Sequence, residues 1–176
     1  YAQVPTIAAI RGLALGGGCE LSVYCSARVA AMESYIGLVE MGVGVIPGGG
    51  GMTYIARRAA EKASYSTATD LLPFLTEGFT AAAMAKVGTS ALESRDLDYI
   101  LHSDTIVANK DELLYVAIQR ARAMFQCGYR PPLRRLFPVA GRDGKATIQG
   151  QLVNMRDGGF ISAHDFDIAS HIANIA

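Results

Sequence analysis

The chain has 176 residues, enough for one domain with a hydrophobic core. Hydrophobic residues make up 51% of it and charged residues 18%, and its 16 basic residues balance its 16 acidic ones. This composition leaves no basic stripe for binding nucleic acid, and no apolar run is long enough to span a membrane.

The three cysteines, Cys19, Cys25 and Cys127, lie in apolar surroundings and lack the spacing of a disulfide framework or a zinc site. Residues 1–5 lack the basic start and the apolar stretch of a signal peptide. A reducing cytoplasm is therefore the simplest location. The three histidines do not cluster, so no metal site is predicted.

The first third of the chain alternates predicted strands and helices. Residues 6–10 form an apolar run bounded by Pro5 and Gly12, which predicts a buried strand. Residues 16–18 are all glycine and predict a turn, after which residues 19–25 predict a buried helix.

Two further strands are predicted at residues 27–32 and 35–36. Residues 40–51 are rich in glycine and predict a loop, and residues 52–60 predict a helix. The order strand, helix, strand, strand, loop, helix implies an α/β fold with at least one crossover.

The rest of the chain is predicted to be mainly helical. Residues 74–86 have helical spacing, residues 89–94 look like the capped start of another helix, and residues 104–107 predict a short strand. Asn109 and the acids after it cap a helix that reaches about residue 125.

Two last helices complete the pattern. Residues 145–155 predict one, and Ser162 to Asp165 resembles a capping box, with Asp in place of Glu, before the other. The chain starts on a strand and ends inside an apolar helical pattern at residues 175–176, which suggests a fragment.

Glu20 and Glu40 are isolated acids in apolar surroundings, and each adjoins a glycine-rich turn. Taken singly, Glu20 could be an acid favoured by the dipole of a helix start, and Glu40 an ordinary loop acid. Two carboxyl groups that face one site can instead hold a water and divide proton donation and removal between them. Gly17 has no side chain, so its backbone N–H can approach a developing oxyanion.

Residues 10–21, Ile-Arg-Gly-Leu-Ala-Leu-Gly-Gly-Gly-Cys-Glu-Leu, closely resemble a signature of the enoyl-CoA hydratase/isomerase (crotonase) superfamily. Residues 35–40 and 44–51 resemble its second signature, and the interval between the two glutamates matches the hydratases. Residues 83–92 and 152–161 resemble the C-terminal hydratase region of long bacterial proteins named 3-hydroxyacyl-CoA dehydrogenases. The resemblance therefore covers the whole chain.

This resemblance implies a partial crotonase-like α/β fold in a single domain over residues 1–176, incomplete at its N-terminus. Residues 1–60 would form the α/β core with the active-site motifs, and residues 61–176 the mainly helical part. The other oxyanion N–H and much of the adenine pocket would lie in the absent portion, so this piece is expected to be inactive alone. Relatives form trimers or dimers of trimers, so a homo-oligomer is expected.

By similarity, the chain hydrates trans-2-enoyl-CoA to 3-hydroxyacyl-CoA in fatty-acid β-oxidation. Glu20 would deprotonate the water, Glu40 would protonate the carbon beside the thioester, and the Gly17 N–H would bind the thioester oxygen. Isomerases rely mainly on the acid at the Glu40 position, so two glutamates favour hydration. Val39 stands where most crotonases have proline before this acid. The resemblance also implies that four residues bind the acyl-CoA: Leu15, Gly16, Gly48 and Gly49.

No dinucleotide-binding fingerprint is present, because the pattern at residues 42–47 fails at its last glycine. No cofactor is therefore expected in this chain, and NAD would belong to a dehydrogenase domain elsewhere in the parent polypeptide. Two alternatives stay open. One is a non-catalytic assembly module with the same fold, and the other is a different crotonase reaction, such as isomerisation or thioester hydrolysis.

Overall fold

The computed structural model describes residues 2–67, 70–133 and 136–175. The chain forms two compact units that alternate along the sequence. The first comprises Tyr1–Gly37 and Val87–Arg135, and the second comprises Leu38–Lys86 and Leu136–Ala176. In the described residues, all strands belong to the first unit, and the second is built from helices.

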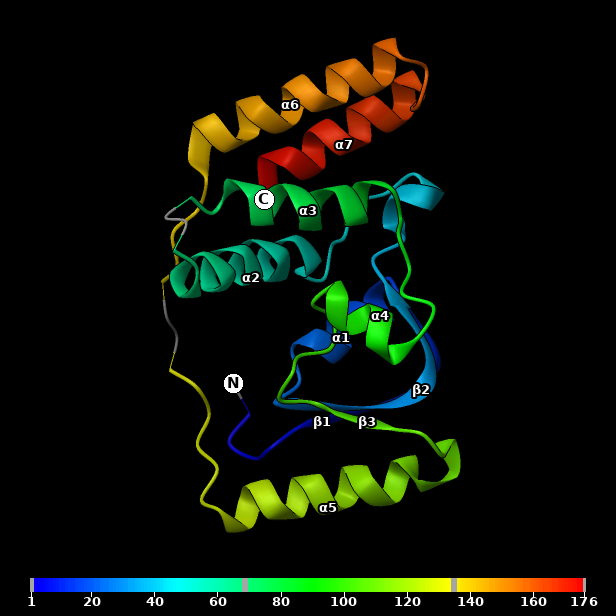
Figure 1. Cartoon of the computed structure of the whole chain (residues 1–176), viewed down its shortest axis with the longest axis vertical. Coiled ribbons are helices and arrows are strands. Elements are labelled where there is room, and N and C mark those ends of the chain that lie inside the picture. Colours follow the sequence, from blue (N-terminus) through cyan, green and yellow to red (C-terminus); the bar gives the residue numbers. More distant parts are fainter. Residues whose placement is uncertain (1, 68–69, 134–135, 176) are drawn as a thin grey trace. The chain divides into compact units, whose positions relative to one another are not determined.

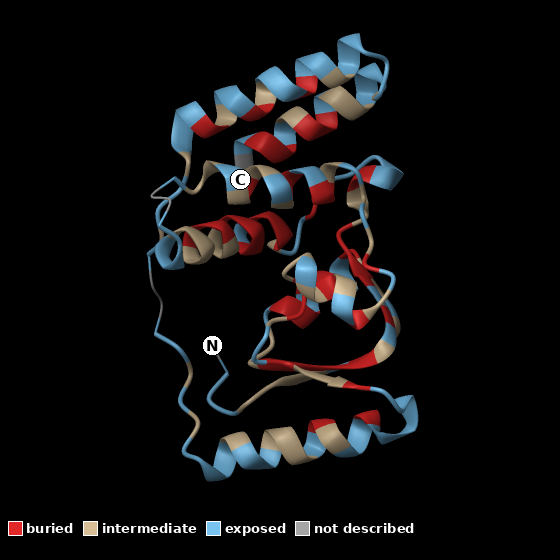
Figure 2. Cartoon of the chain, in the orientation of Figure 1, coloured by how far each residue is buried: buried red, intermediate tan, exposed pale blue. Residues whose placement is uncertain are grey.

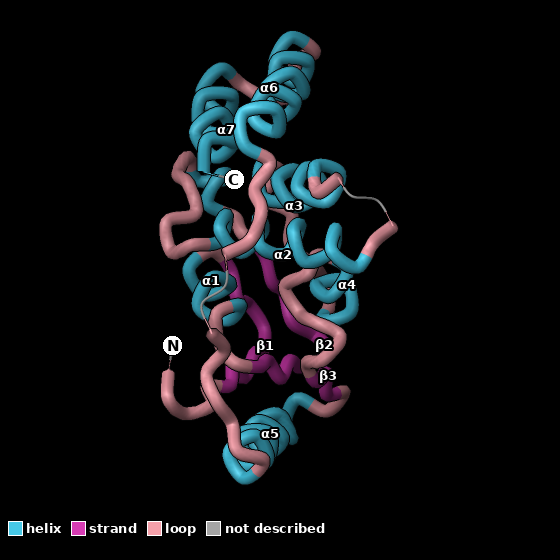
Figure 3. The backbone as a smooth tube through the Cα atoms, turned by 90° about the vertical axis from the view of Figure 1, so that its left-hand side faces the viewer, coloured by secondary structure: helices cyan, strands magenta, loops and turns pink. Residues whose placement is uncertain are grey.

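The first unit is a parallel sheet with helices on both faces, and its strands have the order β1-β2-β3. Helix α1 is the crossover between β1 and β2. Helix α5 covers one face of the sheet, and α1 and α4 lie on the other (Figures 1 and 3). The elements are β1 (Ile7–Leu15), α1 (Gly17–Val23), β2 (Ala27–Gly37), α4 (Ala91–Asp96), β3 (Thr105–Val107), the 3-10 helix η2 (Lys110–Glu112) and α5 (Leu113–Gln126).

A hydrophobic core fills the space between the sheet and α5. Alternate residues of a strand face the same side of a sheet, so Val29 and Ala31 of β2 both point toward the helix. They pack with Val107 of β3 and with Leu113 and Ala117 of α5. Figure 2 shows that α5 is buried only along the side that faces the sheet.

The strands predicted at residues 6–10, 27–32 and 35–36 were too short, whereas the one predicted at residues 104–107 matches β3 to within one residue. Ile10 pairs with Ala30, but Gly12 pairs with Ser34, so β2 bulges between these pairs. Gly12 has a φ of 68°, which lets β1 continue beyond the glycine that was predicted to end it. Beyond the bulge β2 also continues, so the two strands predicted at residues 27–32 and 35–36 are one strand.

The second unit, over its described residues, contains five helical elements. Helix α2 packs on α3 and helix α6 packs on α7, and α7 also touches η1, α2 and α3. A Cβ on Gly78 of α3 would lie 2.6 Å from Cγ2 of Ile55, so α2 and α3 approach closely there. The elements are the 3-10 helix η1 (Glu40–Val43), α2 (Gly51–Tyr65), α3 (Leu72–Ala83), α6 (Gly141–Asp157) and α7 (Ala163–Ile175).

The helix starts predicted at residues 89–94 and at Ser162 are confirmed. Asn109 instead caps the 3-10 helix η2, and α5 itself begins only at Leu113. Ser90 Oγ accepts the Glu93 N–H, and Asn109 Oδ1 accepts the Asp111 N–H. At α7, Ser162 and its acidic partner three residues later exchange hydrogen bonds in both directions, as a capping box requires. Across the described ranges, no helix has the length and apolar character needed to cross a membrane.

Candidate active site

The first part of the candidate site is the junction between β1 and α1. Leu15 is the last residue of β1, and Gly16 follows it with φ 54° and ψ −122°, a backbone conformation open essentially to glycine alone. The Gly16 N–H donates to Gly37 O at 2.9 Å, and Gly16 O accepts the Glu20 N–H at 2.9 Å. The helix therefore begins at Gly17, and the turn predicted over residues 16–18 consists of Gly16 only.

Helix α1 presents a backbone amide and a carboxyl group one turn apart. The N–H groups in the first turn of a helix have no acceptor within the helix. Gly17 is exposed, and a Cβ added there would meet nothing within 4 Å. Glu20 is only 6% exposed, so its carboxyl group is largely removed from bulk water. One turn of helix thus carries both a backbone donor and a carboxyl group.

Glu40 lies in the second unit, at the first residue of η1, where the sequence predicted a loop. Its side chain is half-buried, and its Oε2 atom is buried. The backbone is held by the Val45 N–H, which donates to Glu40 O at 3.1 Å. Gly44 ends the turn with φ 79°, and a Cβ there would lie 3.5 Å from His164 Nε2 of α7. Helix α7 therefore backs the turn that carries this acid.

Gly48 and Gly49 are exposed and lie in the segment between η1 and α2. Gly50 follows with φ 100° and caps α2, which begins at Gly51 rather than at the predicted Met52.

The structure thus groups the predicted site residues into two sets. Leu15, Gly16, Gly17 and Glu20 form one continuous segment of the first unit. Glu40 lies in the second unit, together with the two glycines that precede α2. The convergence of the two glutamates on one reaction centre stays a prediction.

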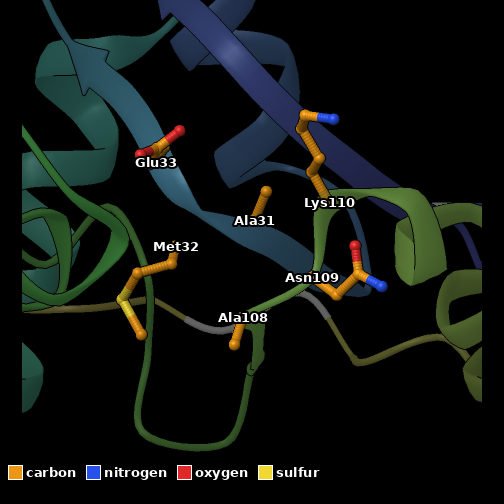
Figure 4. Close-up of a pocket in the computed structure, with 6 residues that line it drawn as sticks. All are labelled: Ala31, Met32, Glu33, Ala108, Asn109 and Lys110. Atoms are coloured by element: carbon orange, nitrogen blue, oxygen red, sulfur yellow. The ribbon is translucent and has the colours of Figure 1, made fainter.

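The sequence did not indicate a pocket that the structure shows in the first unit (Figure 4). The pocket has a volume of about 340 Å³ and lies beside the bulge of β2, at the carboxyl end of β3. None of the predicted site residues lines it. Its charged groups are exposed, and one of them, Lys110, already pairs with Asp111 at 3.2 Å. The lining residues are Ala31, Met32, Glu33, Ala108, Asn109 and Lys110.

Comparison with known proteins gives a family match and several relatives. The family model described as enoyl-CoA hydratase/isomerase matches residues 1–94. A Bacillus subtilis protein named "Probable 3-hydroxyacyl-CoA dehydrogenase" is 39% identical over 179 residues, which covers 99% of this chain and 22% of that protein. The fatty acid oxidation complex subunit alpha of Colwellia psychrerythraea is 54% identical over 55 residues, 31% of this chain and 8% of that protein. The chain therefore spans less than a quarter of the length of these relatives.

Solved structures show the same fold at lower identity. An enoyl-CoA hydratase from Bacillus anthracis superposes with a TM-score of 0.52 at 24% identity, covering 97% of this chain and 52% of that one. An enoyl-CoA hydratase from Mycobacterium tuberculosis superposes with a TM-score of 0.52 at 21% identity, covering 96% of this chain and 53% of that one. At these identities the likeness concerns the fold alone.

Proposed function

Because the chain belongs to the enoyl-CoA hydratase/isomerase family, we propose that it carries the acid–base residues that add water to a trans-2-enoyl-CoA thioester. The observation that supports this best is the β1–α1 junction. There a glycine-only turn places the Gly17 amide and the Glu20 carboxyl group on one short helix. Water addition needs these two kinds of group, a donor for the thioester oxygen and a base for water.

In the proposed reaction, Glu20 takes a proton from water while the oxygen forms a bond to C3 of the enoyl group. Electron density moves through C2 onto the thioester oxygen, where the Gly17 N–H stabilises it. Removing one such donor typically costs about 3 kcal/mol of barrier. Glu40 then gives its proton to C2, so that the product is a 3-hydroxyacyl-CoA. At the end of the reaction Glu20 is protonated and Glu40 is ionised. Glu20 then releases its proton to solvent and Glu40 takes one up, which restores the starting state.

We propose that this reaction belongs to fatty-acid oxidation, since the name of the Colwellia relative refers to it and the name of the Bacillus relative refers to a dehydrogenase of 3-hydroxyacyl-CoA, the product of this hydration. The full-length protein would act as a homo-oligomer on acyl-CoA substrates. These assignments extend beyond the chain itself, which corresponds to 22% of the Bacillus protein.

Substrate profiling of single variants in the full-length protein tests the proposal. Glu20→Gln and Glu40→Gln should each nearly abolish hydration of crotonyl-CoA, followed by the loss of absorbance of the conjugated thioester. An isomerase would keep its activity in the Glu20→Gln variant, because it depends mainly on the other acid. Unchanged hydration in either variant would end the proposal.

Calorimetry with an acyl-CoA separates the enzyme from an assembly module of the same fold. We expect the wild-type protein and both glutamine variants to bind the thioester, because the substitutions keep the size of the side chains. A full-length protein that binds no acyl-CoA would favour the assembly module.

A further inference from the structure

Helix α1 depends on β2 at both of its ends. It has seven residues, and isolated helices shorter than about 12 residues are marginal in water. At its start, the Gly16 N–H donates to Gly37 O, in the last residue of β2. At its end, Arg28 Nη1, from the second residue of β2, donates to Val23 O at 3.0 Å. Strand β2 therefore holds α1 at both ends, through Gly16 before the helix and through Val23, its last residue.

Arg28 is itself held by a buried ion pair. Its Nε lies 2.5 Å from Asp104 Oδ2, and the two side chains are 4% and 1% exposed. Asp104 Oδ1 accepts the backbone N–H of Arg28 at 2.9 Å, and Oδ2 also accepts the Leu101 N–H at 2.7 Å. Buried charges are tolerated when they are paired and hydrogen-bonded, as both are here. Asp104 therefore holds the guanidinium group in place independently of its contact with α1.

The geometry of arginine matters at this position. The guanidinium group donates from Nε to Asp104 and from Nη1 to Val23 O at the same time. Lysine carries its donors on a single nitrogen, so it can keep the ion pair but does not reproduce the two separate donor positions of the guanidinium group. The positive charge also lies at the carboxyl end of α1, where it interacts favourably with the helix dipole.

We infer that Arg28, held by Asp104, is a positioning residue that fixes α1 and thereby the direction of the Glu20 carboxyl group. Glu20 lies about one turn before Val23 in the same helix. A displacement of the last turn of α1 would therefore also displace Glu20. The inference rests on the proposed function, because it concerns the base of that reaction. A misplacement of about 1 Å at a reacting group can cost about a hundredfold in rate.

The test is the kinetics of Arg28→Lys in the full-length protein, assayed well below its unfolding temperature. The value of kcat for crotonyl-CoA hydration should fall about tenfold to a hundredfold. KM should stay within about twofold, because the lost alignment matters mainly in the transition state. Hydrogen exchange should become faster in α1 and stay unchanged in β2. Arg156→Lys, at an arginine of α6 that pairs with its neighbour Asp157, is the control and should leave kcat and KM unchanged.

Asp104→Glu supplies a second variant in case Arg28→Lys does not fold. It keeps both charges but displaces the guanidinium group by one methylene length, so the same selective fall in kcat is expected. If Arg28→Lys has the wild-type kcat while Glu20→Gln is inactive, the positioning role is refuted and the proposed function stands. Full activity of Glu20→Gln would instead refute the proposed function and this inference together.

Discussion

At the scale of single residues, the backbone of Gly16 is the feature on which the candidate site most depends. Its φ of 54° and ψ of −122° are strained for any residue with a side chain. We predict that Gly16→Ala lowers the free energy of unfolding by about 1–3 kcal/mol. Gly18→Ala is the matched control, because a Cβ there meets nothing within 4 Å and alanine favours the helix. Denaturant unfolding of both variants checks this, and equal stabilities would contradict it.

The capping box of α7 makes a pH-dependent contribution to stability. The Ser162 hydroxyl and then its backbone N–H lower the pKa of Asp165 by hydrogen bonding to the carboxylate, with a smaller effect of His164. The folded state thus binds this proton more weakly than the unfolded state. The resulting stabilisation is present at neutral pH and is lost as the pH falls through the lowered pKa.

Ser162→Ala removes the strongest of these hydrogen bonds. We predict that the variant is less stable than the wild type at pH 7, and that part of the difference disappears below pH of about 4. Ser64→Ala is the control, because its hydroxyl donates to a carbonyl, Glu61 O, and should give a difference that is constant with pH. Urea unfolding over a pH series measures both. A constant difference for Ser162→Ala would show that the hydroxyl does not act on the carboxylate.

At the scale of elements, α5 is attached to the sheet through one side only. Leu113 is 7% exposed within the core, whereas Leu114, its neighbour on the same helix, is 66% exposed. We predict that Leu113→Ala costs about 2–5 kcal/mol of unfolding free energy, while Leu114→Ala changes it by less than about 0.5 kcal/mol. Thermal or denaturant unfolding distinguishes them. Similar losses in both variants would mean that the outer side of α5 is also buried in solution.

The segment that precedes α4 lies between β2 and the body of that helix. Gly88 bridges to Ile36 of β2, and a Cβ on Gly88 would lie 2.8 Å from Ser94 N. The backbone of α4 cannot move away without losing helical hydrogen bonds. We therefore predict that Gly88→Ala destabilises the protein by about 1–3 kcal/mol. Gly150→Ala, in α6 with no atom within 4 Å, should be neutral or stabilising. Equal unfolding midpoints for the two variants would contradict the close approach.

At the scale of the whole molecule, the crotonase-like α/β fold predicted from the sequence is confirmed by the family match and by the solved structures. Local features were predicted best. The cap at Ser90 involves residues only three positions apart, so the sequence contains all of the information. The extension of β1 beyond Gly12 was missed, because a glycine ends some strands and lies inside others, here opposite a bulge in β2.

Contacts between distant residues were not predictable from one sequence. Arg28 and Asp104 are separated by 76 positions, and no local pattern indicates that they pair. The same limit applies to the candidate site. The segment from Gly16 to Glu20 could be predicted, because it is a single strand–turn–helix junction. The predicted convergence of Glu20 and Glu40 is a contact between residues of two units, so no local pattern indicates it.

The central claim is that these two carboxyl groups act as one unit on one substrate. A double-mutant cycle on kcat for crotonyl-CoA hydration tests it, with Glu20→Gln, Glu40→Gln and the double variant in the full-length protein. Each single substitution should reduce kcat by about 10²–10⁴, and the double variant should be little slower than the slower single one. Full activity in either single variant, or a double variant slowed by the product of the two single effects, would contradict the claim.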